Sequence, residues 1–233
     1  MTARYAIYFM PLPETALWRF GSSVIGYDAE ISRGVPTPDH DVFSEPGAEG
    51  NTTEPRRYGF HATLKAPFAL ADGVGESALM VQATAFAAQR ESFAVPPLTV
   101  ATIERFIALV PATANAALDG LAAECVRTFE PMRAPLSTED VVRRRAAALT
   151  PRQTTHLERW GYPYVFEDFR FHMTLTGPLE AETRARWMEA LKTLYAPVAA
   201  PFTVNAITIA RQPDRDSRFT VVARFPFTQA RGG

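Results

Sequence analysis

Two short stretches, HATLKAP at residues 61–67 and HMTLTGP at residues 172–178, decide how this chain is organised. Both fit the pattern His-x-Thr-Leu-x-x-Pro, and each is followed by a segment with the composition of a helix. Each copy then continues into a Phe-x-Val sequence, at residues 93–95 in the first and 202–204 in the second. A shared order of similar segments indicates an internal repeat.

The repeat predicts how the chain is divided. We expect one two-lobed domain over residues 1–233, with the first copy at about 58–110 and the second at about 169–227. The segment between the copies, about 111–168, is then an insertion. Three stretches within it read as helices, at residues 115–129, 138–149 and 152–160, so we expect it to be largely helical.

The connections within each copy favour the α+β class. Two consecutive strands in each copy are joined directly and can form antiparallel hairpins, whereas parallel strands need a helical crossover. We expect two pseudo-symmetric lobes, each an antiparallel sheet with helices on its outer face, around a central groove. Residues 4–10 add one more strand, and the Pro- and Gly-rich residues 33–55 form a long loop.

Alternation along a strand predicts where the motif side chains point. Successive residues of a strand face opposite sides, so His61 shares a face with Thr63, and His172 shares one with Thr174. Apolar residues occupy the positions between them, so each motif strand has a polar face and a face suited to packing against helices. Two such strands at a common groove bring together two imidazoles and two hydroxyls.

Four further residues are candidates for substrate binding. Alternation predicts that Lys65 lies on the His61 face and Arg170 on the His172 face. Tyr58 and Arg57 come just before the first motif, where an aromatic ring or a guanidinium can contact a substrate. An edge aromatic and a solvated basic side chain are their ordinary alternative roles.

These side chains suit the chemistry of phosphate esters. A neutral histidine can take a proton from attacking water, and a protonated one can give a proton to the leaving oxygen. Threonine hydroxyls can donate to the non-bridging oxygens, while a lysine or arginine offsets the negative charge. The scheme requires no metal and no cofactor. The histidines of the chain stand in unrelated contexts, at His40, His61, His156 and His172.

The composition excludes several classes of protein. Hydrophobic residues make up 47% of the chain and charged residues 21%, a balance that favours a packed core over disorder. The net charge of −1 gives no general attraction to long nucleic acids or anionic membranes. A single cysteine, Cys125, leaves no intrachain disulfide, and no apolar run reaches the roughly 18 residues of a membrane span. We expect a cytoplasmic protein without a signal peptide.

The paired motifs resemble those of the 2H phosphoesterase superfamily, which carries two His-x-[Thr/Ser]-x motifs. HATL at residues 61–64 and HMTL at residues 172–175 match this pattern. The longer stretches RYGFHATLKAPF and FRFHMTLTGPL resemble a bacterial branch associated with phosphonate utilisation. The resemblance covers nearly the whole chain and implies a two-lobed fold with the motifs facing each other across a groove.

The resemblance also implies roles for four residues. In the superfamily the motif histidines act as acid and base and the hydroxyls bind phosphate, which assigns catalysis to His61 and His172 and phosphate binding to Thr63 and Thr174. The leading hypothesis is a metal-independent phosphoesterase that hydrolyses a cyclic phosphodiester of a nucleotide or phosphoribosyl metabolite in phosphonate catabolism. Such an enzyme is expected to bind a small phosphorylated substrate and no membrane.

Two alternatives come from other classes of function. One is RNA-end processing, including 2′-5′ ligase-like chemistry, with an RNA terminus as partner; the near-neutral charge argues against a long RNA footprint. The other is a non-catalytic protein that binds a nucleotide or a phosphoribosyl group. Binding alone needs no acid–base pair, so the two intact histidines favour an enzyme.

Overall fold

The computed structural model describes residues 3–145 and 148–228. Its strands form a seven-stranded antiparallel sheet, in the order β4-β5-β6-β2-β1-β8-β9, and a two-stranded sheet of β3 and β7. The strands are β1 (Arg4–Phe9), β2 (Ala62–Phe68), β3 (Phe93–Val95), β4 (Leu98–Ile103), β5 (Phe106–Pro111), β6 (Met173–Thr174), β7 (Phe202–Val204), β8 (Ala206–Gln212) and β9 (Thr220–Pro226).

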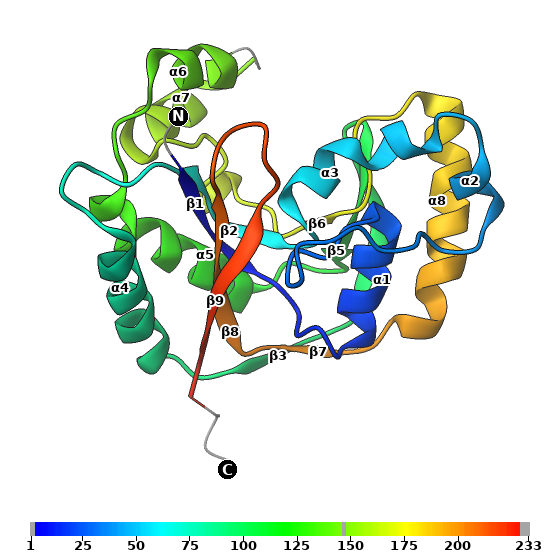
Figure 1. Ribbon diagram of the computed structural model, residues 1–233, viewed down its shortest axis with the longest axis horizontal. Helices are drawn as coiled ribbons and strands as arrows, with labels where there is room; N and C mark the ends of the chain where they lie inside the picture. Colours follow the sequence, from blue (N-terminus) through cyan, green and yellow to red (C-terminus); the bar gives the residue numbers. More distant parts are fainter. Residues whose placement is uncertain (1–2, 146–147, 229–233) are drawn as a thin grey trace.

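The helices gather on two sides of the strands (Figure 1). One group holds α4 (Glu76–Ala88), α5 (Ala116–Thr128), α6 (Thr138–Arg145) and α7 (Pro151–Trp160), and the other holds α1 (Ala16–Ile25), α2 (Asp41–Ser44), α3 (Thr53–Tyr58) and α8 (Ala181–Tyr195). Four 3-10 turns complete the fold, η1 (Ala48–Thr52), η2 (Glu130–Met132), η3 (Phe166–Asp168) and η4 (Ala196–Val198). The expected α+β class is confirmed. None of the helices in the described ranges has the length and apolar character that a membrane span requires.

The two motif strands are neighbours in one sheet. We expected each copy to form a sheet of its own, but β2 pairs directly with β6 and joins the copies into a continuous sheet. The β4–β5 hairpin of the first copy extends the sheet beyond β6, and the β8–β9 hairpin of the second extends it beyond β1. In the sheet, the hairpin of each copy therefore lies nearer to the motif strand of the other copy than to its own.

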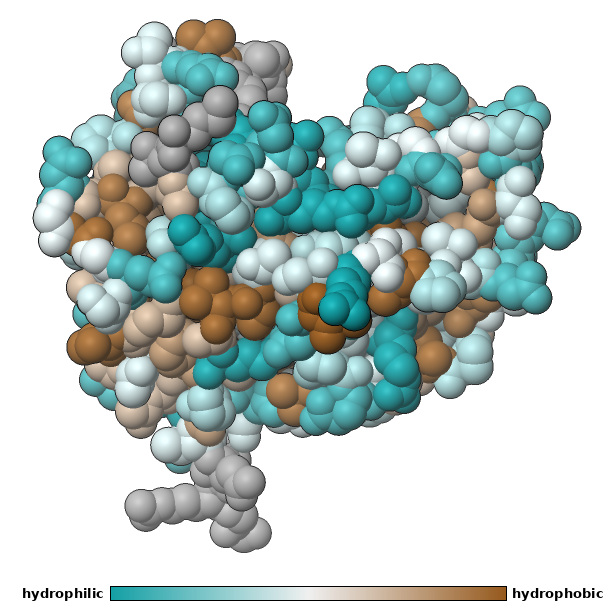
Figure 2. Space-filling model, in the orientation of Figure 1, coloured by the Kyte–Doolittle hydropathy of each residue, from teal (hydrophilic) through white to brown (hydrophobic). Residues whose placement is uncertain are grey.

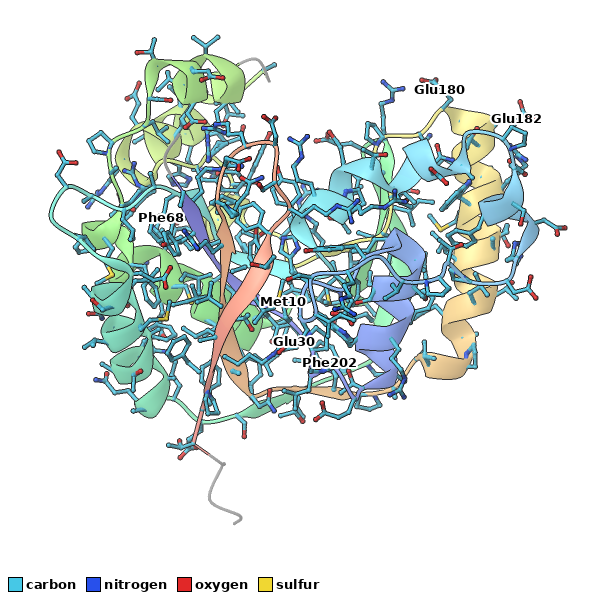
Figure 3. All side chains as sticks on the ribbon, in the orientation of Figure 1. Met10, Glu30, Phe68, Glu180, Glu182 and Phe202 are labelled. Carbon is cyan, nitrogen blue, oxygen red and sulfur yellow. The ribbon has the colours of Figure 1, made fainter. Side chains whose placement is uncertain are left out.

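A second pairing relates the copies. The two Phe-x-Val sequences form β3 and β7, with Phe93 opposite Val204 and Val95 opposite Phe202. Each phenylalanine faces the valine of the other copy, as an approximate two-fold relation requires. This ribbon crosses between the two groups of helices in Figure 1, and Phe202, labelled in Figure 3, lies 5.6 Å from Phe9 of β1 between ring centroids.

The segment between the copies contributes α5, α6 and α7. Helix α7 begins with a capping box, in which Thr150 accepts from the backbone N–H of Gln153 and the Gln153 side chain accepts from the N–H of Thr150. It ends at Gly161, whose φ of 71° suits a residue without a Cβ. Helix α5 packs against β2, so the insertion covers one motif strand.

Candidate active site

The pairing of β2 with β6 brings the two motifs together. The paired residues are Ala62 and Met173, each of which directly follows its motif histidine. One step forward on an antiparallel strand is one step back on its partner, so His61 lies opposite Thr174, and Thr63 lies opposite His172. The histidines are thus diagonal neighbours, a relation that separates such residues by about 7 Å. The four motif residues therefore lie at one place on the sheet.

Burial alternates along both motif strands as expected. The two histidines and the two threonines of the motifs are partly exposed. Their strand neighbours are buried, namely Ala62, Leu64, Met173 and Leu175. The polar side chains therefore lie on the face of the sheet away from the hydrophobic core, and the apolar side chains pack into that core.

Backbone carbonyls set the same tautomer on both imidazoles. The Nδ1 atom of His61 lies 2.8 Å from the carbonyl oxygen of Gly59, and that of His172 lies 2.7 Å from the carbonyl oxygen of Arg170. A carbonyl oxygen only accepts, so Nδ1 carries the proton in both rings and Nε2 keeps its lone pair. The hydroxyl of Thr63, 3.1 Å from Nε2 of His61, donates to it.

The carbonyl that holds His61 depends on a glycine. Gly59 follows α3 with a φ of 77°, a region that side chains other than glycine rarely adopt. A Cβ at this position would lie 2.6 Å from the Cβ of Ala29. The tight turn between Tyr58 and Phe60 therefore requires Gly59, and it aims the carbonyl at the imidazole.

Aromatic rings enclose His61. Tyr8 of β1 pairs with Thr63, which puts both side chains on one face of the sheet. The Tyr8 ring lies 3.8 Å from the His61 ring between centroids, tilted by 30°. Tyr58 lies 6.1 Å from the same imidazole and stacks on Phe219 at 5.4 Å. The ring of His61 is therefore confined on more than one side.

His172 has a more open environment. Its ring lies 5.8 Å from Phe106, which occupies in the first copy the place that Phe219 holds in the second. It also lines a cavity of about 440 Å³, together with Thr63, Arg170 and Tyr162. Helices α5 and α7 of the inserted segment contribute to the cavity wall. The space beside His172 and Thr63 therefore suits a substrate larger than a phosphate ion.

The surroundings lower the pKa of both imidazoles. Burial lowers the pKa of His61 to about 4; its contact with the Gly59 carbonyl opposes this shift, and the charge of His172 adds to it. Burial also lowers the pKa of His172 below 6.5, against the effect of the Arg170 carbonyl. The effect of His172 on His61 reflects their proximity. Both rings are therefore mainly neutral at pH 7 and can accept protons.

Lys65 lies away from the histidines, contrary to the expectation from alternation. The register of β2 against β1 shifts after Thr63, because Tyr8 pairs with Thr63 but Ile7 pairs with Lys65. The extra residue turns Lys65 to the other face of the strand. There its Nζ lies 2.7 Å from the carboxylate of Glu130, and only 4% of its side chain is exposed.

The other candidates lie at or near the motifs. Arg170 is exposed and lines the cavity, and Tyr58 is half-buried beside His61. Arg57 is exposed on α3, and its carbonyl accepts from the N–H of Phe219. Sequence reasoning missed Tyr8 and Tyr162, because their approach depends on strand order and loop path. The aromatic run of β1 was a local signal for Tyr8 alone.

The fold and the site define an α+β protein with two similar segments, each of which contributes one His/Thr motif to the site. The family model described as "Protein of unknown function (DUF1045)" matches residues 63–220, more than half of the chain. The chain belongs to this family.

Two curated relatives carry the name Ribose 1,5-bisphosphate phosphokinase PhnN. The protein from Janthinobacterium sp. (strain Marseille) is 38% identical over 97% of this chain and 51% of its own length. The protein from Laribacter hongkongensis (strain HLHK9) is 35% identical over 79% of this chain and 42% of its own length. The chain thus spans about half the length of the curated relatives it matches.

Solved structures similar to the chain include E. coli LigT. LigT complexed with 3′-AMP has a TM-score of 0.47 and LigT complexed with NADP+ one of 0.49, each at 14% identity over 98% of this chain and 100% of LigT. TT0787 of Thermus thermophilus has a TM-score of 0.46, at 14% identity over 99% of this chain and 100% of that protein.

The pair of Lys65 and Glu130 is expected to stabilise the fold. Glu130→Ala leaves the buried Lys65 ammonium uncompensated, removes a second ion pair with Arg133, and should lower the free energy of unfolding by about 3 kcal/mol in urea denaturation. Lys192→Met, in an exposed pair with Glu189, is the control and should cost under about 1 kcal/mol. Equal costs for the two variants would contradict a structural role for Lys65.

Proposed function

We propose that this chain is a metal-independent phosphoesterase that opens a cyclic phosphodiester, with His61 and His172 as its acid–base pair. The observation that carries the proposal is the matching tautomer of the two rings. Each donates its Nδ1–H to the carbonyl two residues earlier, which leaves both Nε2 atoms unprotonated. The Thr63 hydroxyl, which donates to Nε2 of His61 here, would turn to the phosphate of a bound substrate and free that lone pair. An acid and a base on two sides of one phosphorus atom are what hydrolysis of a cyclic ester needs.

The surroundings favour His61 as the base and His172 as the acid. A pKa of about 4 keeps His61 neutral, so its Nε2 can take a proton from water as the water oxygen attacks phosphorus. The ring P–O bond then breaks, and Nε2–H of a protonated His172 gives its proton to the leaving oxygen. Water thus supplies OH to phosphorus and, through the two rings, H to the released hydroxyl.

The remaining motif residues would bind the phosphate. Thr63 and Thr174 stand opposite the two histidines in the strand register, so their hydroxyls can donate to the non-bridging oxygens. Arg170 lines the cavity and can offset the negative charge. We assign substrate contacts to Tyr58 and Arg57 as well, because Tyr58 lies beside His61 and Arg57 precedes it on α3.

The relatives' name supports a phosphoribosyl substrate. Those longer proteins are named as kinases of ribose 1,5-bisphosphate. Hydrolysis of 5-phosphoribosyl 1,2-cyclic phosphate at the bond to O2 yields ribose 1,5-bisphosphate, with a phosphomonoester on O1 and a free 2-hydroxyl. A phosphodiesterase of this kind would supply the kinase named in the relatives. We propose this cyclic phosphate as the substrate, within phosphonate catabolism.

A second candidate function is the phosphokinase reaction itself. It is favoured by the relatives' name, which this chain matches over about half of their length. The sequence lacks the Gly-x-x-x-x-Gly-Lys-[Ser/Thr] loop by which many nucleotide kinases hold phosphates. Incubation of the chain with ATP and ribose 1,5-bisphosphate separates the two functions, since only a kinase forms a product that depends on ATP.

The decisive assay compares cyclic phosphates of different classes. Wild-type protein is incubated with 5-phosphoribosyl 1,2-cyclic phosphate, nucleoside 2′,3′-cyclic phosphates and an RNA ending in a 2′,3′-cyclic phosphate, and the product isomers are identified by phosphorus NMR. Preferred turnover of the phosphoribosyl compound supports the proposed substrate. Turnover of the RNA end alone would favour RNA-end processing, and binding without turnover would favour the non-catalytic alternative.

Removal of either imidazole should slow turnover without unfolding the chain. His61→Ala and His172→Ala should each lower kcat by about two to four orders of magnitude, the usual effect of a general acid or base. His40→Ala is the matched control, because His40 caps the short helix α2 and lies outside the site. Thermal melting checks that the variants fold. Wild-type turnover in either site variant would contradict the acid–base roles.

Turnover should not depend on a divalent metal ion. After dialysis against EDTA, kcat should stay within about twofold of its starting value, because the two imidazoles perform both proton transfers. Loss of activity that zinc or magnesium restores would instead indicate a metal-bound nucleophile.

The pH–rate profile should have an acidic optimum. As pH rises through about 4, His61 loses its proton and becomes a competent base, so kcat/KM rises. As pH rises towards 6.5, His172, whose pKa is lowered by burial, loses the proton it must donate, so kcat/KM falls. The maximum is therefore expected between about 4 and 6.5. A maximum above pH 8 would contradict this assignment.

A further inference from the structure

Two tyrosines lie beside His61, and a third lines the neighbouring cavity. Tyr8 belongs to β1, Tyr58 ends α3, and Tyr162 lies between α7 and η3. The first two have their rings 3.8 Å and 6.1 Å from the His61 ring, and Tyr162 lines the cavity that also contacts Thr63. The proposed acid–base reaction uses none of their hydroxyls.

The Tyr8 and Tyr162 hydroxyls are available as hydrogen-bond donors. Burial raises the pKa of Tyr162 to about 12 and that of Tyr8 well above 10, so both phenols stay protonated at neutral pH. Negative charge on Tyr58 would raise both values further, and negative charge on Tyr162 would raise that of Tyr8. Tyr8 is the strand partner of Thr63, and Tyr162 lines the cavity together with Thr63, so both tyrosines lie near this threonine. A group of phenol donors suits an acceptor with several oxygens, such as a phosphate.

The hydroxyl of Tyr8 is buried and lacks a hydrogen-bond partner within residues 3–145 and 148–228. Buried polar groups are nearly always paired, because an unpaired one costs free energy. The rest of the Tyr8 side chain is well packed, with 0% of the residue exposed. A ligand oxygen that reaches the Tyr8 hydroxyl would therefore gain a hydrogen bond without displacing an existing partner.

The charges around the tyrosines favour an anion. The guanidinium of Arg144 lies 5.1 Å from the Tyr162 ring, and the charges of Arg4 and Arg144 lower the pKa values of Tyr8 and Tyr162, respectively. The cavity wall elsewhere carries Glu104, Glu167 and Asp168 together with Arg152 and Arg170, and Arg152 forms an ion pair with Asp168. The rest of the wall is therefore of mixed charge, whereas the Arg144 guanidinium attracts a second anionic group of the substrate towards Tyr162.

We propose that Tyr8, Tyr58 and Tyr162, with Arg4 and Arg144 near them, form a subsite for a second phosphate of the substrate. The inference rests on the proposed function, in which the substrate carries a 5-phosphate in addition to its cyclic phosphate. The histidines act on the cyclic phosphate, and the tyrosine subsite binds the 5-phosphate. The subsite thereby selects phosphorylated ribose over the unphosphorylated sugar.

A comparison of two substrates tests the subsite. We would measure kcat/KM for 5-phosphoribosyl 1,2-cyclic phosphate and for ribose 1,2-cyclic phosphate, with wild type and with Tyr162→Phe and Tyr8→Phe. Each variant should lose about 10- to 100-fold on the first substrate and little on the second, since a hydrogen bond to a charged group is lost only there. Equal losses on both substrates would overturn the proposal.

A matched control lies on the same strand. Tyr5→Phe removes a hydroxyl that donates to Glu76, and it should change neither kcat/KM value. It separates the subsite from a general effect of losing a phenol from β1.

Calorimetry keeps the subsite testable even if no cyclic phosphate is hydrolysed, an outcome that by itself would reject only the proposed function. Ribose 5-phosphate should bind more tightly than ribose, and Tyr162→Phe should weaken its binding by about tenfold or more. If ribose 5-phosphate binds no better than ribose, or equally well to the variant, the subsite is wrong.

Discussion

The pairing of Ala62 with Met173 is the constraint on which the candidate site depends. This one contact between β2 and β6 turns both preceding histidines to the same face of the sheet and makes them diagonal neighbours. A slip of one residue would turn the imidazoles of one strand into the core and the apolar side chains into the groove. The burial of Ala62 and Met173 opposes such a slip, because their exposure would cost hydrophobic free energy.

The two histidines share a local geometry but not an environment. Both donate Nδ1–H to the carbonyl two residues earlier, which follows from the repeated backbone path. His61 is then confined by Tyr8 and Tyr58, whereas His172 borders the cavity. A repeat with identical motifs can in this way hold two imidazoles of different basicity. The proposed division into base and acid has its physical origin in this difference.

The inserted segment gives the site its shape. Residues of α5 and α7 line the cavity, and the loop after α7 supplies Tyr162. The copies themselves are tied together at β2–β6 and at β3–β7, so the cavity lies beside a rigid sheet. Figure 2 shows hydrophilic residues along the notch between the two groups of helices. Catalytic geometry would thus come from the repeat and substrate selection from the insertion.

The sequence by itself determined the repeat, the α+β class and the polar face that each histidine shares with its threonine, because these depend on local order and on the two-residue period of a strand. It also predicted that the motifs would meet. Only the tertiary structure decided that they meet as adjacent strands of one sheet, since strand order depends on contacts between distant segments. The register shift after Thr63, which turns Lys65 towards Glu130, has no signal in strict alternation. The approach of Tyr8 and Tyr162 to the histidines was likewise decided by packing, because neither residue is near a motif in the sequence.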